Sequence, residues 1–392
     1  MAQIVSAEKQ TLEIAHILQK HMADYQRQYP LWPEHKKVVS DLLNCRTPAL
    51  GGRIERCDTC GVLRIIYHSC RNRHCPKCQH MPREQWLAKR KEEILPATYY
   101  HVVFTLPHEL NPVILNNKKV MLDLLFAAAS KTLLSFAKNE LGGKVGFLAI
   151  LHTWDQKLNA HFHLHCLVAG GVVADETTRW IACTKDYLFN QRALSLVFRG
   201  KFMALMSDAR KSEKFKYEDQ RYRALKNTLF SKNWVVSVRD PVKHAEHVLE
   251  YLARYTHRVA IANSRIKAIK DNTVTFTAKN RKEHRIEQVT VSAVEFIRRF
   301  LLHSLPKGFV RIRHYGFLAN RNRKSNVAII KCLLGCTPSV QQSVIGLEQM
   351  MFGLTGVDIT TCPCCKKGKM RLVLEIFIRR ARGPTHFIRC AN

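Results

Sequence analysis

The stretch Ala160-His161-Phe162-His163-Leu164-His165-Cys166-Leu167-Val168 sets three histidines in strict alternation with other residues. This alternation predicts a β-strand, because successive side chains of a strand point to opposite faces of a sheet. The three imidazoles would line one face, and the hydrophobic residues between them would point into a core. Neutral imidazole nitrogens bind divalent metals well, so the stretch predicts a metal site on a rigid support.

A second strand, predicted for Val145 to Leu151, supplies a further histidine. His152 ends this strand, and a loop over 152–160 would allow the two strands to pair antiparallel. The pairing would bring His152 beside His163 and His165. The third metal ligand is then either His152, which we favour, or His161. We expect Mg²⁺ or Mn²⁺ at this site, with open positions for phosphate oxygens.

The flanking segments predict a mixed α+β protein. A strand is predicted over Thr98–Leu106, followed by helical pattern from about 111 to 140 that ends at Gly142-Gly143. Gly170-Gly171 is expected to close the histidine strand, and residues 191–232 are mostly helical and very basic.

A predicted helix over 240–258 carries two tyrosines four residues apart, Tyr251 and Tyr255. Asp240-Pro241 is expected to open it, with Asp as the N-cap and Pro at the first helical position. The spacing places both phenols on one helix face, from which they could attack a phosphodiester. Arg254 and Arg258 could brace the phosphate oxygens. The competing interpretation is a hydrophobic core stripe formed by Val248, Tyr251, Leu252, Tyr255 and Val259.

The charge of the chain indicates a polyanionic partner. Its 392 residues contain 63 Lys plus Arg against 31 Asp plus Glu, a net charge of +32. Nucleic acid is the natural partner for such an excess. An acidic membrane surface is disfavoured, because the basic residues run throughout the chain. With no run of about 18 apolar residues and no signal peptide, we expect a cytoplasmic protein.

Fourteen cysteines fall largely into two clusters that predict zinc sites. In the first cluster, Cys57/Cys60 and Cys75/Cys78 form two CxxC pairs that could supply four thiolates to one ion. The nearby Cys45, Cys70, His68 and His74 could complete a second ion or exchange with these ligands. Near the C-terminus, Cys362 and Cys365 could form another site, with distant His386 and Cys390 as partners.

Taken together, these features resemble the HUH-type, rolling-circle transposases of bacterial insertion sequences that use two tyrosines. The matching stretches run in the family's order through nearly the whole chain: Cys70-Arg71-Asn72-Arg73-His74-Cys75-Pro76-Lys77-Cys78, His101–Pro107, His152-Thr153-Trp154, His161–Cys166, Tyr251–Ile261 and Arg311-Ile312-Arg313-His314-Tyr315-Gly316.

The resemblance implies an antiparallel-sheet HUH nuclease domain with flanking helices. It implies that His163 and His165 bind the metal and that Tyr251 and Tyr255 attack single-stranded DNA. The attack would leave a 5′-phosphotyrosine and a free 3′-OH, so that strand transfer needs no ATP. The expected partners are single-stranded DNA, hairpins at the element ends and target DNA, in a bacterial cytoplasm at the nucleoid. Expected DNA contacts come from Arg254, Arg258, Arg311, Arg313, Arg321 and Arg323.

The expected organisation has three parts. Residues 1–95 form a helical and zinc-binding DNA-binding domain, and 96–325 form the catalytic domain with the basic helical insertion. Residues 326–392 form a basic C-terminal region with a candidate zinc knuckle. The alternative functions are an HUH replication initiator or relaxase, and a non-catalytic zinc-dependent DNA-binding regulator.

Overall fold

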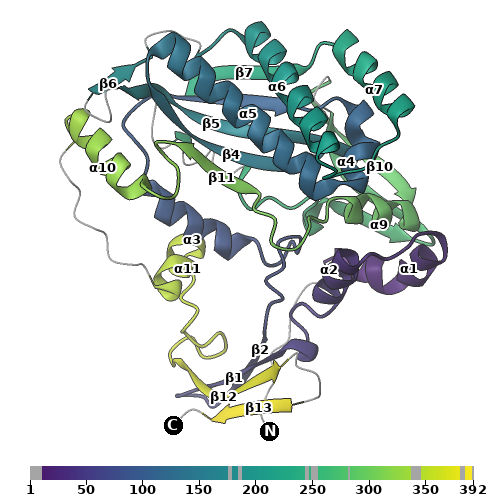
Figure 1. Ribbon diagram of the computed structural model, residues 1–392. Coiled ribbons are helices and arrows are strands. Elements are labelled where there is room, and N and C mark those ends of the chain that lie inside the picture. The colour runs from purple at the N-terminus through teal and green to yellow at the C-terminus, as the bar shows by residue number, and fades with distance from the viewer. Residues whose placement is uncertain are drawn as a thin grey trace.

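The computed structural model describes residues 11–174, 179–183, 188–242, 247–248, 255–280, 283–336, 346–379 and 385–390. These residues form a mixed α and β structure with three antiparallel sheets (Figure 1). The α+β fold class predicted from the sequence is confirmed.

The central sheet carries the histidines. Its strands lie in the order β11-β4-β5-β3-β7, and β6 pairs with β5. Helices α5 and α6 pack together across one face of this sheet, as Figure 1 shows. The strand bounds are β3 Tyr99–Thr105, β4 Lys144–Trp154, β5 Ala160–Ala174, β6 Arg179–Ala182, β7 Val235–Val242 and β11 Ile312–Gly316.

The two faces of β5 divide as the alternation predicts. Phe162, Leu164 and Cys166 are buried in the main hydrophobic core, which also contains the apolar faces of α5 and α6. The opposite face of β5 carries the histidines. The helices near this core are α4 Asn111–Asn116, α5 Lys118–Leu141, α6 Gln191–Lys211 and α7 Asp219–Ser231.

The prediction that Gly170-Gly171 closes the histidine strand is wrong. Strand β5 continues through both glycines to Ala174. A Cβ on Gly170 would lie 2.6 Å from the Thr98 carbonyl oxygen, and one on Gly171 would lie 2.2 Å from the Trp180 ring. These glycines therefore permit close approach of neighbouring chain inside a strand, rather than a turn after it.

Helix α5 is long and apolar enough by composition to cross a membrane. In the fold it is a core helix, because Leu122, Leu125, Phe126 and Leu133 are buried in the main core. Its apolar length is thus explained by packing against α6, β4 and β5.

The expected helix start at Asp240-Pro241 is also wrong. Strand β7 includes both residues and ends at Val242. Its register with β3 shifts between Tyr99 and His101, opposite this dipeptide, and β7 is the edge of the sheet. Proline is tolerated at such edge and bulge positions, since no ladder hydrogen bond is lost there. Of the tyrosine segment, His247, Val248 and the residues from Tyr255 onward are described, whereas Tyr251 and Arg254 lie outside the described residues.

A second sheet packs with the first helices of the chain. Strands β8 Ile266–Lys270, β9 Thr273–Asn280 and β10 Arg285–Ser292 form a three-stranded meander. Helices α1 Ile14–Gln28, α2 Pro33–Leu43 and α9 Ala293–Leu302 share a hydrophobic core with it. This core includes the buried Cys45, Cys75 and Cys78.

The third sheet joins the two ends of the chain. Its order is β13-β12-β1-β2, with β1 Gly51–Cys57, β2 Leu63–Tyr67, β12 Met370–Arg379 and β13 Thr385–Cys390. Figure 1 shows it at the bottom of the molecule, apart from the central sheet. Among the described residues, further helices are α3 His80–Lys91, α10 Arg323–Leu333 and α11 Leu347–Thr355. One sheet of the structure therefore combines strands from residues 1–95 with strands from residues 326–392, which the sequence analysis assigned to separate parts.

Candidate metal centre and DNA pocket

Three histidines from β4 and β5 converge on one point. His152 is the direct cross-strand partner of His163, and His165 is two residues further along β5. One ring nitrogen from each of the three lies within 4.8 Å of the others. His161 lies outside this group and is exposed, although its ring centroid is 4.7 Å from that of His163. The favoured ligand set of His152, His163 and His165 is thus the set that the structure brings together.

Hydrogen bonds orient the three imidazoles. The Nδ1 of His163 lies 2.9 Å from the His161 carbonyl oxygen, and the Nε2 of His152 lies 2.9 Å from the Tyr255 carbonyl oxygen. A carbonyl only accepts, so these nitrogens are the protonated ones and the opposite nitrogen of each ring carries the lone pair. The third ring, His165, has a buried Nε2 without a hydrogen-bond partner. A divalent metal would satisfy this nitrogen, so the residues fit such an ion.

A fourth histidine stands behind the triad. The Nε2 of His101 on β3 lies 2.9 Å from the Nδ1 of His165. If His165 Nδ1 donates this bond, its Nε2 is unprotonated and faces the metal position. The sequence reasoning missed this role. Alternation along β3 places His101 and Val103 on the same face of the sheet. Val103 pairs directly with His165, so the pairing of β3 with β5 brings His101 to the triad.

Burial keeps these imidazoles neutral. Removal from water lowers the pKa of His152 and of His101 to about 3 each, and it also depresses the pKa of His165. The positively charged Arg258 contributes to the lowering for His152 and His165. Neutral imidazole is the form that binds a metal, so His152 and His165 are ready to ligate at physiological pH.

Tyr255 lies directly against the triad. Its ring centroid is 4.2 Å from that of His165, 5.5 Å from that of His101 and 5.8 Å from that of His152. Just after it, His257 adopts a left-handed backbone conformation (φ +51°), which is typical of a helix C-terminus. The competing core interpretation holds in part, since Val248 is buried and half-buried Tyr255 packs at the edge of the same hydrophobic cluster.

The triad opens into a pocket of about 640 Å³. Its walls come from β3, β4, β5, β7, β9 and β10, together with Tyr255 and Arg258. Four cationic side chains line it: Lys157, Arg239, Arg258 and Lys279. Of the two acidic residues present, Glu287 pairs with Lys157 (Nζ to Oε1, 2.9 Å), and Asp155 is held by its own loop. The pocket therefore combines a metal position with an electropositive wall suited to phosphates.

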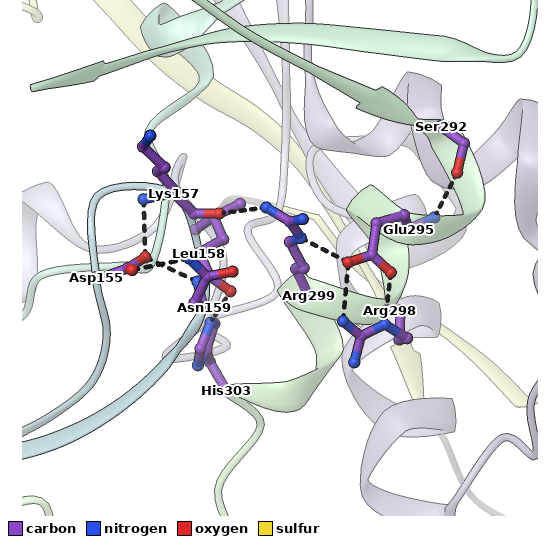
Figure 2. Close-up of polar contacts among 9 residues, drawn as sticks. All are labelled: Asp155, Lys157, Leu158, Asn159, Ser292, Glu295, Arg298, Arg299 and His303. Carbon is purple, nitrogen blue, oxygen red and sulfur yellow. Dashed lines mark hydrogen bonds and ion pairs between the residues drawn. The ribbon is translucent and has the colours of Figure 1, made fainter. Parts of the chain in front are cut away.

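The hairpin loop between β4 and β5 forms one rim and is fixed from two sides (Figure 2). Asp155 Oδ1 accepts hydrogen bonds from the backbone amides of Lys157 and Asn159, both at 2.8 Å. Arg299 of α9 donates to the Lys157 carbonyl at 3.0 Å, and His303, the residue after α9, donates to the Leu158 carbonyl at 3.1 Å. The loop thus holds the start of the histidine strand in place.

Glu295 in turn orients Arg299. Its carboxylate accepts hydrogen bonds from both Arg298 and Arg299, as Figure 2 shows. The bond from Arg298 is the main cause that lowers the pKa of Glu295 to about 2. The amide of Glu295 is capped by the Ser292 hydroxyl at 3.2 Å, which begins α9 in the orientation that reaches the loop.

The arginines expected to contact DNA occupy different environments. Arg258 lines the pocket, whereas Arg311 donates to the Arg258 carbonyl at 3.1 Å and is sufficiently buried that its pKa falls to about 10. Arg313 bonds Asp123 and stacks over Phe126. Three of the six are thus anchored within the fold: Arg311, Arg313 and Arg323, the last through Glu93 and Asn320. Arg321 is exposed.

The cysteines form two groups of four, but not in the expected combination. Cys57 and Cys60 do not join Cys75 and Cys78. Instead, Cys75 and Cys78 join Cys45 and Cys70, and Cys57 and Cys60 join Cys362 and Cys365. Sequence proximity suggested the first combination, whereas pairing of β1 with β12 draws the first CxxC pair toward the C-terminal segment.

The Cys45 group has dimensions suited to zinc. Sulfur distances are 3.4 Å from Cys45 to Cys78, 3.6 Å from Cys45 to Cys75 and 3.7 Å from Cys70 to Cys78. A tetrahedral ion with zinc–sulfur bonds of about 2.3 Å requires edges of about 3.8 Å, close to these values.

His74 and His68 lie outside both groups of cysteines. The Nε2 of His74 accepts a long hydrogen bond from the Leu305 amide at 3.5 Å, and burial lowers its pKa to about 3. His74 therefore faces the segment that follows α9 rather than the sulfurs. His68 lies near Glu375 and stacks on Phe377. The side chains of His386 and Cys390 lie outside the described ones.

Comparison with known proteins relates both the segment with the histidine triad and the segment with the Cys45 group to transposases. A family model described as "Putative transposase" matches residues 146–326, and one described as "Transposase zinc-binding domain", of the IS91 type, matches residues 17–106. The histidine triad and the Cys45 group thus lie within segments that match transposase families.

Two curated relatives identify the family more closely. "Putative transposase y4qJ" from Sinorhizobium fredii is 42% identical over 93% of this chain and 95% of its own length. "Transposase for insertion sequence element IS801" from Pseudomonas savastanoi pv. phaseolicola is 27% identical over 73% of this chain and 70% of its own length. The chain belongs to the IS91/IS801 family of rolling-circle transposases. No solved structure matches the chain.

Proposed function

We propose that this transposase cleaves and rejoins single-stranded DNA at the histidine site, with Tyr255 as a nucleophile. The observation that carries the proposal is the position of the Tyr255 ring, 4.2 Å from the His165 ring in a pocket lined by cations. A divalent ion held by His152, His163 and His165, which we expect to be Mg²⁺ or Mn²⁺, would polarise the scissile phosphate when bound.

The protein's own residues supply the remaining steps. Arg258, with Arg239 and Lys279 across the pocket, would bind the negatively charged backbone. The Tyr255 phenolic oxygen would form a bond to phosphorus while the bond from phosphorus to the 3′ oxygen breaks. The phenol gives up a proton to water, and the departing 3′ oxygen takes one up. The product is a 5′-phosphotyrosine, which keeps the phosphodiester energy for strand transfer.

A single strand suits this site better than a duplex. The reacting phosphate must lie against the floor of the pocket, between strands of the sheet and Tyr255, and a flexible strand can follow such a wall. Hairpins at the element ends and the target strand would then occupy this pocket in turn. Tyr251 is proposed as the second nucleophile on the strength of its four-residue spacing from Tyr255.

The test is incubation of the purified chain with end-labelled hairpin DNA and Mn²⁺, followed by denaturing electrophoresis. The wild type should give a covalent protein–DNA band, and His163→Ala should give none while still binding DNA. If the double variant Tyr251→Phe/Tyr255→Phe leaves this band at full strength, neither tyrosine is the nucleophile and the proposal fails. Binding without any cleavage would favour a regulator.

The alternative of an HUH replication initiator or relaxase differs in the fate of the DNA. A transposase should join the bound 5′ end to a second, unrelated single strand, whereas an initiator should act on its own origin only. Adding an unlabelled target strand to the same reaction separates the two, because only the transposase produces a joined product of new length.

A further inference from the structure

The second group of cysteines connects parts of the chain that are far apart in sequence. The sulfurs of Cys57, Cys60, Cys362 and Cys365 lie within 4.8 Å of one another, although 302 residues separate Cys60 from Cys362. The sulfur distances are 3.7 Å for Cys57 to Cys365 and 3.7 Å for Cys60 to Cys362. Tetrahedral thiolate coordination at about 2.3 Å requires about 3.8 Å, so the four sulfurs already have the spacing of zinc ligands.

In each of the two loops that carry the cysteines, backbone amides point at a cysteine sulfur. The backbone amides of Thr59 and Cys60 each point at the Cys57 sulfur at 3.4 Å, and the amide of Gly368 points at the Cys365 sulfur at 3.4 Å. Amide donors of this kind stabilise a thiolate, the form of cysteine that binds a metal.

The loops also fit closely against each other. A Cβ on Gly368 would lie 2.5 Å from the Cys57 sulfur, so only glycine allows this approach. The Asp58 amide donates to the Lys369 carbonyl at 3.0 Å, and the Lys369 amide donates to the Asp58 carboxylate at 2.8 Å. Cys57 pairs with Met370 in the antiparallel register of β1 and β12.

Hydrophobic burial contributes little to this junction. The local cluster of buried apolar residues contains only Cys57, Val62, Cys362 and Met370 among the described residues. The surrounding strands expose apolar side chains, including Ile65, Leu372 and Phe377. A sheet without a core of its own needs another source of stability, and small modules of this kind commonly obtain it from a structural metal.

We infer that one Zn²⁺, held by Cys57, Cys60, Cys362 and Cys365, fastens the C-terminal segment to the N-terminal zinc-binding module. Soft thiolate ligands in a closed tetrahedral set select zinc over magnesium or manganese. The matched zinc-binding family model ends at residue 106 and so covers only half of these ligands. The protein then binds two structural zinc ions, and its zinc-binding module is complete only when the chain has been synthesised almost to its end.

The test is a zinc count by native mass spectrometry on the full chain and four Cys-to-Ser variants. The wild type should carry two tightly bound zinc ions. C57S/C60S and C362S/C365S should each carry one, and the quadruple variant should still carry one, because both pairs hold the same ion. C364S is the matched control, since Cys364 is exposed and lies outside the group, and it should keep two.

Hydrogen exchange gives a second measurement that separates zinc loss from unfolding. In both double variants the β12 amides should exchange at least 10-fold faster, while β5 keeps its wild-type protection. Two zinc ions in C362S/C365S would overturn the inference. So would a quadruple variant that loses both ions while each double variant loses one, since the two ends would then hold separate ions.

Discussion

Replacing His101 by alanine tests how the metal ligands are oriented. His101 is 3% exposed and reaches His165 through one hydrogen bond of 2.9 Å. With His165 Nδ1 as the donor of this bond, His101→Ala removes its acceptor and leaves the metal-facing nitrogen in place. The imidazole of His165 can then change tautomer or rotate, so we expect weaker metal binding without loss of the ligand itself.

The size of the effect follows from the burial of this bond. Leaving a buried donor unsatisfied costs about 1–3 kcal/mol. Loss of the partner behind a metal-bound histidine lowers metal affinity by about 10- to 100-fold. At about 1.4 kcal/mol per decade this is about 1.4–2.8 kcal/mol, and the two estimates agree.

The assay is titration of Mn²⁺ into the chain, followed by electron paramagnetic resonance of the free ion. His101→Ala should raise the Mn²⁺ dissociation constant by about 10- to 100-fold. DNA cleavage should recover at high Mn²⁺. His101→Gln retains a hydrogen-bond acceptor at a similar reach, so its Mn²⁺ dissociation constant should lie between those of the wild type and His101→Ala. His161→Ala is the control and should leave Mn²⁺ affinity unchanged, because the exposed His161 side chain lies outside the triad. An unchanged affinity in His101→Ala would refute the reasoning.

Three further outcomes follow from the structure. Phe104 is fully buried in the main core. Phe104→Ala should therefore lower the free energy of unfolding in urea by about 3–5 kcal/mol, and a loss below about 1 kcal/mol would contradict this packing. Burial lowers the pKa of His152 from 6.5 to about 3, so between these values the unfolded chain binds a proton that the folded chain does not. The free energy of unfolding should therefore be highest above about pH 6.5 and should fall towards pH 3. A melting temperature that stays constant from pH 7 to 5 would contradict this prediction. Arg299→Ala removes the hydrogen bond to the Lys157 carbonyl and should lower the free energy of unfolding in urea by about 1.5–3 kcal/mol. Arg298 bonds Glu295, and Arg298→Ala should cost less. Equal losses in the two variants would show that the contact with the loop contributes nothing to stability.

Local pattern was sufficient for the strands that carry the site. Alternation over 160–168 predicted which side chains face the core, and the antiparallel partner placed His152 opposite His163. Local pattern failed where neighbours decide the conformation. Gly170-Gly171 resembles a strand end, but the carbonyl of Thr98 and the ring of Trp180 require glycine within the strand.

The ligand groups show a different limit. Two CxxC pairs fourteen residues apart have the spacing of partners in one zinc site, and no local feature of the sequence indicates that the first pair belongs with Cys362 and Cys365. That grouping depends on the pairing of β1 with β12, which is a contact between the two ends of the chain. Similarly, the role of His101 depends on a third strand, β3, lying beside β5.

The most direct measurement for the central claim is peptide mapping of the covalent protein–DNA complex by mass spectrometry. After nuclease and protease digestion, we predict a nucleotide on the phenolic oxygen of Tyr255 or Tyr251, formed with Mn²⁺ by the wild type and not by His165→Ala. A nucleotide attached to any other side chain, or undiminished attachment in His165→Ala, would contradict the account.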